Sequence, residues 1–356
     1  MIPTKSNRKF WMDVLRILAS FLVCFNHSDG YHVFLYQEAD GSLLSWIFVV
    51  VCVLCRVSIP LFLMISGALM LGREESWSVI LKKRVFRFTV ILTAVSLTMY
   101  VLKHPGDFQW EGFLRDLFRG GIVTSYWYLY AYLSFLLMLP FLRRIAAGIT
   151  GGDVAVLMGI RFLLLSVLPL VNYYGSYQDH AQLYLSGDVQ LPMAMVNVIF
   201  YPLIGYYFAN KYPMEHFGKW EAALCLLVCT VQTVVSTVVT YHEGIHRGFT
   251  QNYLALFDYA ATAAVFLLVR RLLENARIPE KLASAAATFS GYVLGIYLME
   301  PILAHFFYDL FFGPYYAMQL PEHRMLLSVV WAVLIMAGGS IVTWVIRRIP
   351  GGKKFL

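Results

Sequence analysis

The segment of residues 10–32 constrains the fold most strongly, because it is an apolar run that carries Asp13, Arg16 and His27. A helix that crosses a membrane does not normally expose such residues to lipid. Arg16 and His27 are eleven positions apart, which places them within about 20° of one another and about 16 Å apart along a helix. Asp13 and Ser20 extend the same face. The pattern predicts a membrane span with one polar side that faces protein or water.

The composition of the whole chain supports a membrane protein. Hydrophobic residues make up 59% and charged residues 14% of it, whereas soluble domains carry about 25% charged residues. Ten apolar segments have the length of a membrane helix, and we expect an all-α integral membrane bundle of about ten transmembrane helices, in one domain over residues 1–356. The predicted spans are residues 10–32, 44–72, 85–102, 122–142, 156–172, 193–210, 221–241, 253–273, 286–312 and 325–346.

The distribution of positive charge predicts the orientation of the chain. Of the 28 Lys and Arg residues, 20 fall on the side of the predicted spans that holds both termini, five fall on the other side, and three lie within spans. Positive residues concentrate on the cytoplasmic side of membrane proteins. We therefore expect both termini to be cytoplasmic and the protein to be multi-pass in the cell membrane. The same asymmetry explains the net charge of +7 without a nucleic-acid partner.

Four motifs follow one another along the chain. They are D-x-x-R-x10-H in the first span, SIPLFLMISG at residues 58–67, the pair Arg84 and Arg87 at the start of the third span, and SGYVLGIYLMEP at residues 290–301. In this combination and order, the chain resembles the membrane acyltransferase-3 family. Members of that family transfer acyl groups from acyl-CoA to sugars of surface polysaccharides and to related acceptors.

The resemblance implies roles for individual residues. His27 would act as the base, or carry the acyl group itself, and Arg16, Arg84 and Arg87 would hold the phosphates of acetyl-CoA, with Asp13 orienting Arg16. The expected partners are acyl-CoA, a carbohydrate or lipid-linked acceptor, and membrane lipids, and no metal is expected. The remaining candidate site residues are Glu300 for catalysis and Arg56, Tyr297 and Ser66 for the substrate pocket.

Glu300 lies within a predicted span, where a carboxylate is costly unless it is paired or protonated. Its expected partner is Arg56, Arg161 or His27. Family members often have a histidine before the proline that follows, so Glu300 departs from the family pattern. The departure leaves two interpretations open: Glu300 takes over that role, or it is only a pairing carboxylate.

A competing motif is H-E-x-x-H at residues 242–246. A zinc protease needs this motif on a helix, with a third ligand elsewhere. Here it is expected in an external turn between spans, so a chance match is the preferred interpretation. The five cysteines all fall within predicted spans and are interpreted as packing residues.

Two other functions are compatible with the polar stripe of the first span, which is formed by Asp13, Arg16, Ser20 and His27. A transporter or flippase would use it to line a solute path, and a ligand-sensing membrane domain would use it to bind a small molecule. Residues 110–119 are predicted to form an amphipathic helix in the outer interface, and residues 172–192 to form the longest external loop. The acceptor and the oligomeric state are not determined by the sequence.

Overall fold

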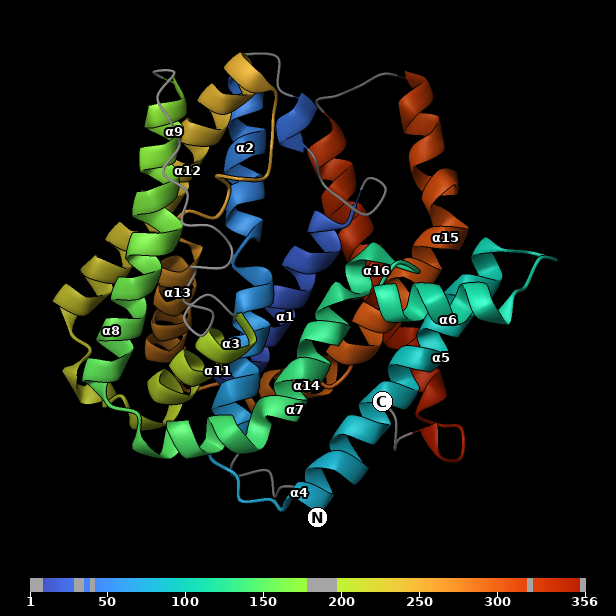
Figure 1. Ribbon diagram of the computed structural model, residues 1–356, viewed down its shortest axis with the longest axis horizontal. Helices are drawn as coiled ribbons and strands as arrows, with labels where there is room; N and C mark the ends of the chain where they lie inside the picture. The colour runs from blue at the N-terminus through green and yellow to red at the C-terminus, as the bar shows by residue number, and fades with distance from the viewer. Residues whose placement is uncertain (1–8, 29–34, 39–41, 178–196, 319–322, 353–356) are drawn as a thin grey trace. The chain divides into compact units, whose positions relative to one another are not determined.

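The computed structural model describes residues 9–28, 35–38, 42–177, 197–318 and 323–352. These residues form helices and turns, with no strand among them (Figure 1). The chain divides into two compact units. Unit 1 comprises Met1–Leu15, Phe34–Arg73 and Phe141–Arg277, and unit 2 comprises Arg16–Val33, Glu74–Pro140 and Ile278–Leu356.

Unit 1 contains the helix of the second motif and the helices from the middle of the chain. They are α2 (Leu43–Cys55), α3 (Ser58–Met70), α8 (Gly151–Arg161), a π-helical segment (Phe162–Val167), α9 (Leu168–Tyr177), α11 (Asn197–Tyr206), a second π-helical segment (Tyr207–Lys211), α12 (Lys219–Arg247) and α13 (Asp258–Leu273). Within this unit α11 packs on α3, and α12 packs on α2 and α13.

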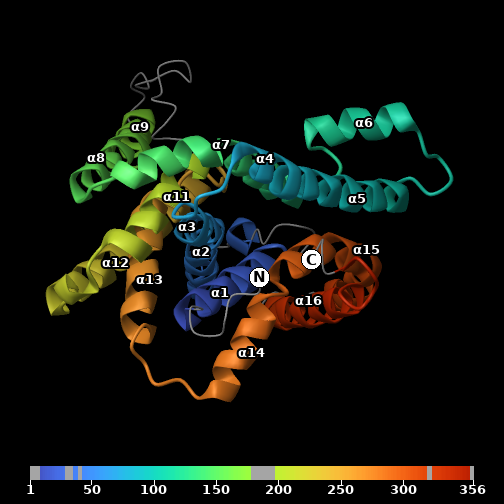
Figure 2. The same cartoon turned by 90° about the horizontal axis from the view of Figure 1, so that it is seen from below.

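Unit 2 contains the helices around the first, third and fourth motifs. They are α4 (Trp77–Val79), a π-helical segment (Ile80–Val85), α5 (Phe86–Lys103), α6 (Trp110–Arg119), α14 (Glu280–Ser290), α15 (Val293–Met318) and α16 (Arg324–Ile346). Helices α15 and α16 lie side by side in both views (Figure 1, Figure 2). Helices α1 (Phe10–Asn26) and α7 (Trp127–Gly148) contribute residues to both units.

Among the described residues, seven helical stretches are long and apolar enough to cross a membrane, so the protein is a multi-pass membrane protein. They are Leu43–Met70, Trp77–Lys103, Thr124–Gly148, Gly151–Gly175, Lys219–Arg247, Val293–Pro314 and Arg324–Ile346. Helices α1, α11 and α13 occupy the three other predicted spans and have 17, 10 and 16 residues. The all-helical fold is confirmed, while the number of ten spans and the side of the termini stay predictions.

Two expectations about loops are wrong. Residues 172–177, expected at the start of the long external loop, complete helix α9; the remaining polar loop residues, Asp179, His180 and Asp188, lie outside the described residues. The H-E-x-x-H motif lies within α12, which continues to Arg247. An isolated glycine such as Gly244 is tolerated in a helix, so it did not end the helix at the predicted point.

Two glycines allow α3 and α11 to cross at very short range. A Cβ atom on Gly67 would lie 2.0 Å from the carbonyl oxygen of Pro202, and one on Gly205 would lie 2.1 Å from that of Met64. Small residues permit such close approach between membrane helices. The glycine that ends the second sequence motif is therefore a packing residue of unit 1.

We expect Gly67→Ala to destabilise the protein by about 1–3 kcal/mol or more, because the clash is with backbone that cannot rotate away. The matched control is Gly159→Ala on α8, where a Cβ atom meets nothing within 4 Å and alanine is the better helix former by about 1 kcal/mol. Thermal unfolding in detergent measures both. Equal melting temperatures for the two variants would contradict the packing role.

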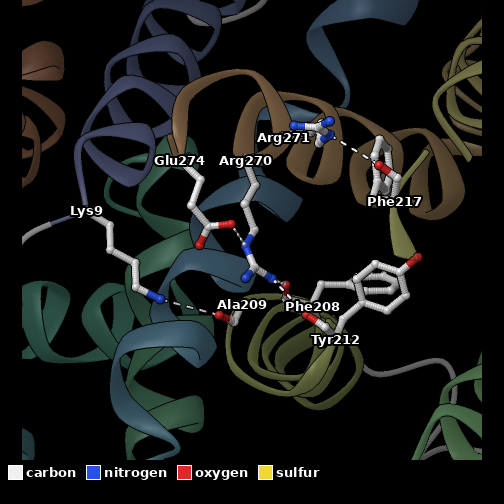
Figure 3. A network of polar contacts seen from close by, with 8 residues as sticks. All are labelled: Lys9, Phe208, Ala209, Tyr212, Phe217, Arg270, Arg271 and Glu274. Carbon is white, nitrogen blue, oxygen red and sulfur yellow. Dashed lines mark hydrogen bonds and ion pairs between the residues drawn. The ribbon is translucent and has the colours of Figure 1, made fainter. Parts of the chain in front are cut away.

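In unit 1, a network of polar contacts joins Lys9 and Arg270 to carbonyl groups of the segment that follows α11 (Figure 3). Arg270 donates to the carbonyls of Phe208 and Tyr212 and, through Nε, to Glu274 at 2.9 Å. The Nζ of Lys9 donates to the carbonyl of Ala209 at 3.4 Å. Burial and the neighbouring guanidinium of Arg270 lower the pKa of Lys9. The last carbonyls of the helix that continues α11 are thus satisfied by side chains.

Candidate active site

His27 lies directly after the last turn of α1. Its backbone N–H donates to the carbonyl of Val23 at 3.0 Å, so helical geometry continues to this residue. Its Nδ1 atom lies 3.4 Å from Oε2 of Glu300 on α15, and the two side chains are 10% and 2% exposed. The structure thus brings together the two residues predicted to be catalytic. Of the three partners expected for Glu300, it is His27 that lies at ion-pair distance.

The carboxylate of Glu300 is buried, and neither of its oxygens accepts a hydrogen bond from the residues that the structure describes. His27 is near enough for an ion pair, but its Nδ1 lacks hydrogen-bond geometry. A buried polar group without a hydrogen bond costs on the order of 1–3 kcal/mol, and more when it is charged. Unsatisfied groups of this kind are rare in folded proteins and are often explained by catalysis. The pair therefore has the character of a site whose contacts are incomplete without a ligand.

Two tyrosines hold this part of α15 against the short turn that precedes α7. The hydroxyl of Tyr297 donates to the carbonyl of Ser125, and the hydroxyl of Tyr126 donates to the carbonyl of Leu298 at 2.9 Å. These reciprocal contacts involve the residues three and two positions before Glu300. They fix the backbone of α15 just before the carboxylate, and the role of Tyr297 in the substrate pocket stays a prediction.

Arg16 contacts the other end of the fourth motif. Its Nη1 atom lies 3.5 Å from Oγ of Ser290, the last residue of α14. Arg16 and His27 are about 16 Å apart at the helical rise of α1. Their contacts, Ser290 and Glu300, are ten positions apart in the fourth motif, on the two successive helices α14 and α15. The polar stripe of α1 faces protein at both ends, as the sequence predicted.

The predicted phosphate-binding pair, Arg84 and Arg87, lies where a π-helical segment continues into the α-helix α5. Arg84 belongs to the π-helical segment Ile80–Val85, a type of segment that is frequent at functional sites. Its Nε and Nη2 atoms donate to the two carboxylate oxygens of Glu75 at 2.8 and 2.5 Å. Arg87 lies within electrostatic range of both Arg84 and Arg347. The guanidinium fork of Arg84 is thus held by a carboxylate, which the sequence analysis did not foresee.

Three predicted site residues belong to unit 1. Asp13 is buried in the first turn of α1, and Arg56 lies at the break between α2 and α3, where its N–H donates to the carbonyl of Val53. The hydroxyl of Ser66 donates to the carbonyl of Phe62 at 2.8 Å, one turn earlier in its own helix. Their assigned roles in donor or substrate binding stay predictions.

Arg161, the third partner considered for Glu300, makes its contacts within unit 1. Its Nη2 donates to Oδ1 of Asn197 at 2.8 Å, and the guanidinium lies 4.0 Å from the ring centre of Phe200. The same cluster contains a hydrogen bond from Tyr201 to Asp258 at 3.2 Å. Arg161 is therefore a buried cation that contacts an amide and an aromatic ring of α11 in unit 1.

The helical H-E-x-x-H motif does not form a metal cluster in the described part of the chain. The rings of His242 and His246 are stacked with centres 6.5 Å apart and are exposed. Glu243 points elsewhere: it is buried and accepts a hydrogen bond from Thr250 at 2.7 Å. Its carboxylate thus serves to attach the end of α12 to the following turn.

Sequence reasoning missed several residues around the candidate site. Tyr126 is buried, whereas its neighbour Trp127 is exposed. Neither Ser125 nor Tyr126 was assigned to the site from the sequence, and Arg347 counted only among the positive residues that predict the orientation of the chain. A buried tyrosine and an interfacial tyrosine look alike in sequence, so only the density of aromatic residues before α7 pointed to this region.

Comparison with known proteins adds one finding. A family model described as an acyltransferase domain matches residues 9–348, which is nearly the whole chain. No curated protein and no solved structure matches. The matched range includes all four sequence motifs and both members of the pair His27 and Glu300.

Proposed function

The chain belongs to the acyltransferase 3 family, and on that premise we propose that it is an integral membrane O-acyltransferase. It takes an acyl group, most simply acetyl, from cytoplasmic acyl-CoA and transfers it to a hydroxyl of a cell-surface sugar or related acceptor. The observation that carries the proposal is the buried pair His27 and Glu300, 3.4 Å apart and joined by α1 to a second polar contact at Arg16.

The donor is held at the end of unit 2 where Arg16, Arg84 and Arg87 lie, because guanidinium groups bind phosphate through directed, charge-assisted hydrogen bonds. The pantetheine arm of acyl-CoA has about thirteen chain bonds, equivalent to about four extended residues or about 15 Å. The arm therefore spans the distance from Arg16 to His27. Glu75 competes with phosphate for Arg84, so Arg87 carries more of the binding energy.

His27 accepts the proton of the acceptor hydroxyl as the oxygen attacks the thioester carbon. The tetrahedral intermediate then releases CoA thiolate, which takes the proton from the imidazolium and leaves as the thiol. The negative charge of Glu300, 3.4 Å from Nδ1, favours a proton on that nitrogen, which leaves Nε2 to act as the base. The negative charge of Glu300 stabilises the imidazolium that forms. Transfer through an acyl-histidine uses the same pair in two steps.

We expect Arg87→Ala to raise the apparent KM for acetyl-CoA by about 10- to 100-fold, since a hydrogen bond to a charged group contributes about 1.5–3 kcal/mol. The maximal rate changes little, because the contact is remote from the thioester. Steady-state kinetics over a range of acetyl-CoA concentrations measures it. The control is Arg144→Ala, an exposed arginine on α7. A KM equal to that of the control would limit Arg87 to a role in topology.

The function itself is tested with purified protein in lipid nanodiscs. Binding of acetyl-CoA, followed by release of CoA thiol when a sugar acceptor is added, supports the transferase. Uptake of a solute into liposomes without any CoA binding would replace the proposal with a transporter. Mass spectrometry of surface glycans from a deletion strain then identifies the acceptor by the acyl group that is lost.

A further inference from the structure

We propose that the turn after α16 forms a binding site for the phosphates of the nucleotide part of acyl-CoA, with Arg347 and Arg348 as its cations. The inference rests on the proposed function and extends it to residues that no motif assigns. A cavity of about 440 Å³, open to the surface, lies at this turn and is lined by Arg347, Arg348, Ile349, Pro350 and Gly351.

The local backbone builds the cavity. Gly351 has a φ of 88°, a left-handed conformation that favours glycine, and it turns the chain back towards the end of α16. The guanidinium of Arg348 lies 4.0 Å from the ring centre of Trp344, one turn earlier. Both the turn and the arginine are therefore held in place before any ligand binds, which lowers the entropic cost of binding.

Arg347 joins this cavity to the donor-binding residues. Its Nη2 donates to the carbonyl of Gly291 at 2.5 Å, and its guanidinium lies 4.9 Å from the ring centre of Tyr292. Ser290, the residue before Gly291, is the contact of Arg16. The first motif, the fourth motif and the turn after α16 thus meet around one short backbone segment in unit 2.

The charges in this region favour an anion with several negative charges. The carboxylate of Glu75 holds Arg84, and Arg87, Arg347 and Arg348 are further guanidinium groups of this region, of which Arg87 and Arg347 influence one another electrostatically. Several guanidinium groups match the phosphates of a nucleotide, which lie at two places, better than they match a single carboxylate.

An anionic lipid headgroup offers the same phosphate chemistry. We favour the nucleotide because Arg347 is attached to Gly291, whose neighbour contacts Arg16, and Arg16 lies on the helix that leads to His27. A phosphate bound there is continuous with the path of the pantetheine arm, whereas a structural lipid needs no such continuity.

The test measures CoA affinity by calorimetry in nanodiscs of phosphatidylcholine alone. The double variant Arg347→Gln, Arg348→Gln should bind CoA at least tenfold more weakly than the control Arg277→Gln, an exposed arginine outside the cluster. The ratio of kcat/KM for acetyl-CoA to that for S-acetylpantetheine, which has no phosphate, should fall by a similar factor. Arg347→Lys should recover part of the loss, because it restores the charge without the planar fork.

Three outcomes would overturn the site. They are a CoA affinity within twofold of the control, an equal loss of activity with both donors, and an effect that occurs only when phosphatidylglycerol is present, which would assign the turn to lipid. If wild-type protein fails to bind CoA at all, the proposed function itself fails. If the wild type binds CoA and the double variant binds it equally well, only this site is lost.

Discussion

His27→Ala is expected to lower the rate of acyl transfer by about 10²- to 10⁴-fold, the range that a positioned general base contributes. The substitution removes the imidazole that lies 3.4 Å from Glu300 and adds no charge. Because His27 follows α1 and is not part of its hydrophobic core, the helix should still form and insert. The measurement is single-turnover acetyl transfer with acetyl-CoA held above its KM.

His305→Ala is the matched control. His305 lies on α15, the same helix as Glu300, but is exposed. Both variants should elute as the wild type does in size-exclusion chromatography, and only His27→Ala should be inactive. Ordinary turnover by His27→Ala would remove the catalytic assignment, whatever its effect on stability.

Glu300→Gln is expected to lower the maximal rate by about 10²-fold while leaving the protein as stable as the wild type or more stable. Glu300 is 1% exposed, and within the described part of the chain its carboxylate accepts no hydrogen bond, so its charge costs folding free energy. Glutamine has nearly the same shape and no charge. It therefore relieves that cost, but it no longer stabilises an imidazolium at His27.

The combination of lost activity and retained melting temperature distinguishes a functional carboxylate from a structural one. The maximal rate should fall with little change in the KM for acetyl-CoA, since Glu300 is remote from the arginines that are proposed to hold phosphate. A lower melting temperature with a normal rate would instead show that Glu300 is a pairing carboxylate. That result would settle, against catalysis, the choice that the departure from the family pattern leaves open.

The sequence by itself determined the helices and the polar face of α1. Apolar runs and their periodicity depend only on neighbouring residues, and each of the ten predicted segments contains helix among its described residues. The burial of Asp13 and Ser20 follows for the same reason, since a polar side of a membrane helix must turn towards protein. The four motifs also indicated the family, which the match over residues 9–348 confirms.

Only the tertiary structure decided which side chains meet. The contact of His27 with Glu300 joins residues 273 positions apart, and it depends on the register between α1 and α15, which no local pattern contains. The guanidinium of Arg84, which contacts Glu75, belongs to a π-helical segment. The wider turn of such a segment changes the direction of every side chain that follows. The approach of Arg347 to Gly291 requires the fold of unit 2, because contacts between helices are set by packing faces and not by the residues along one helix.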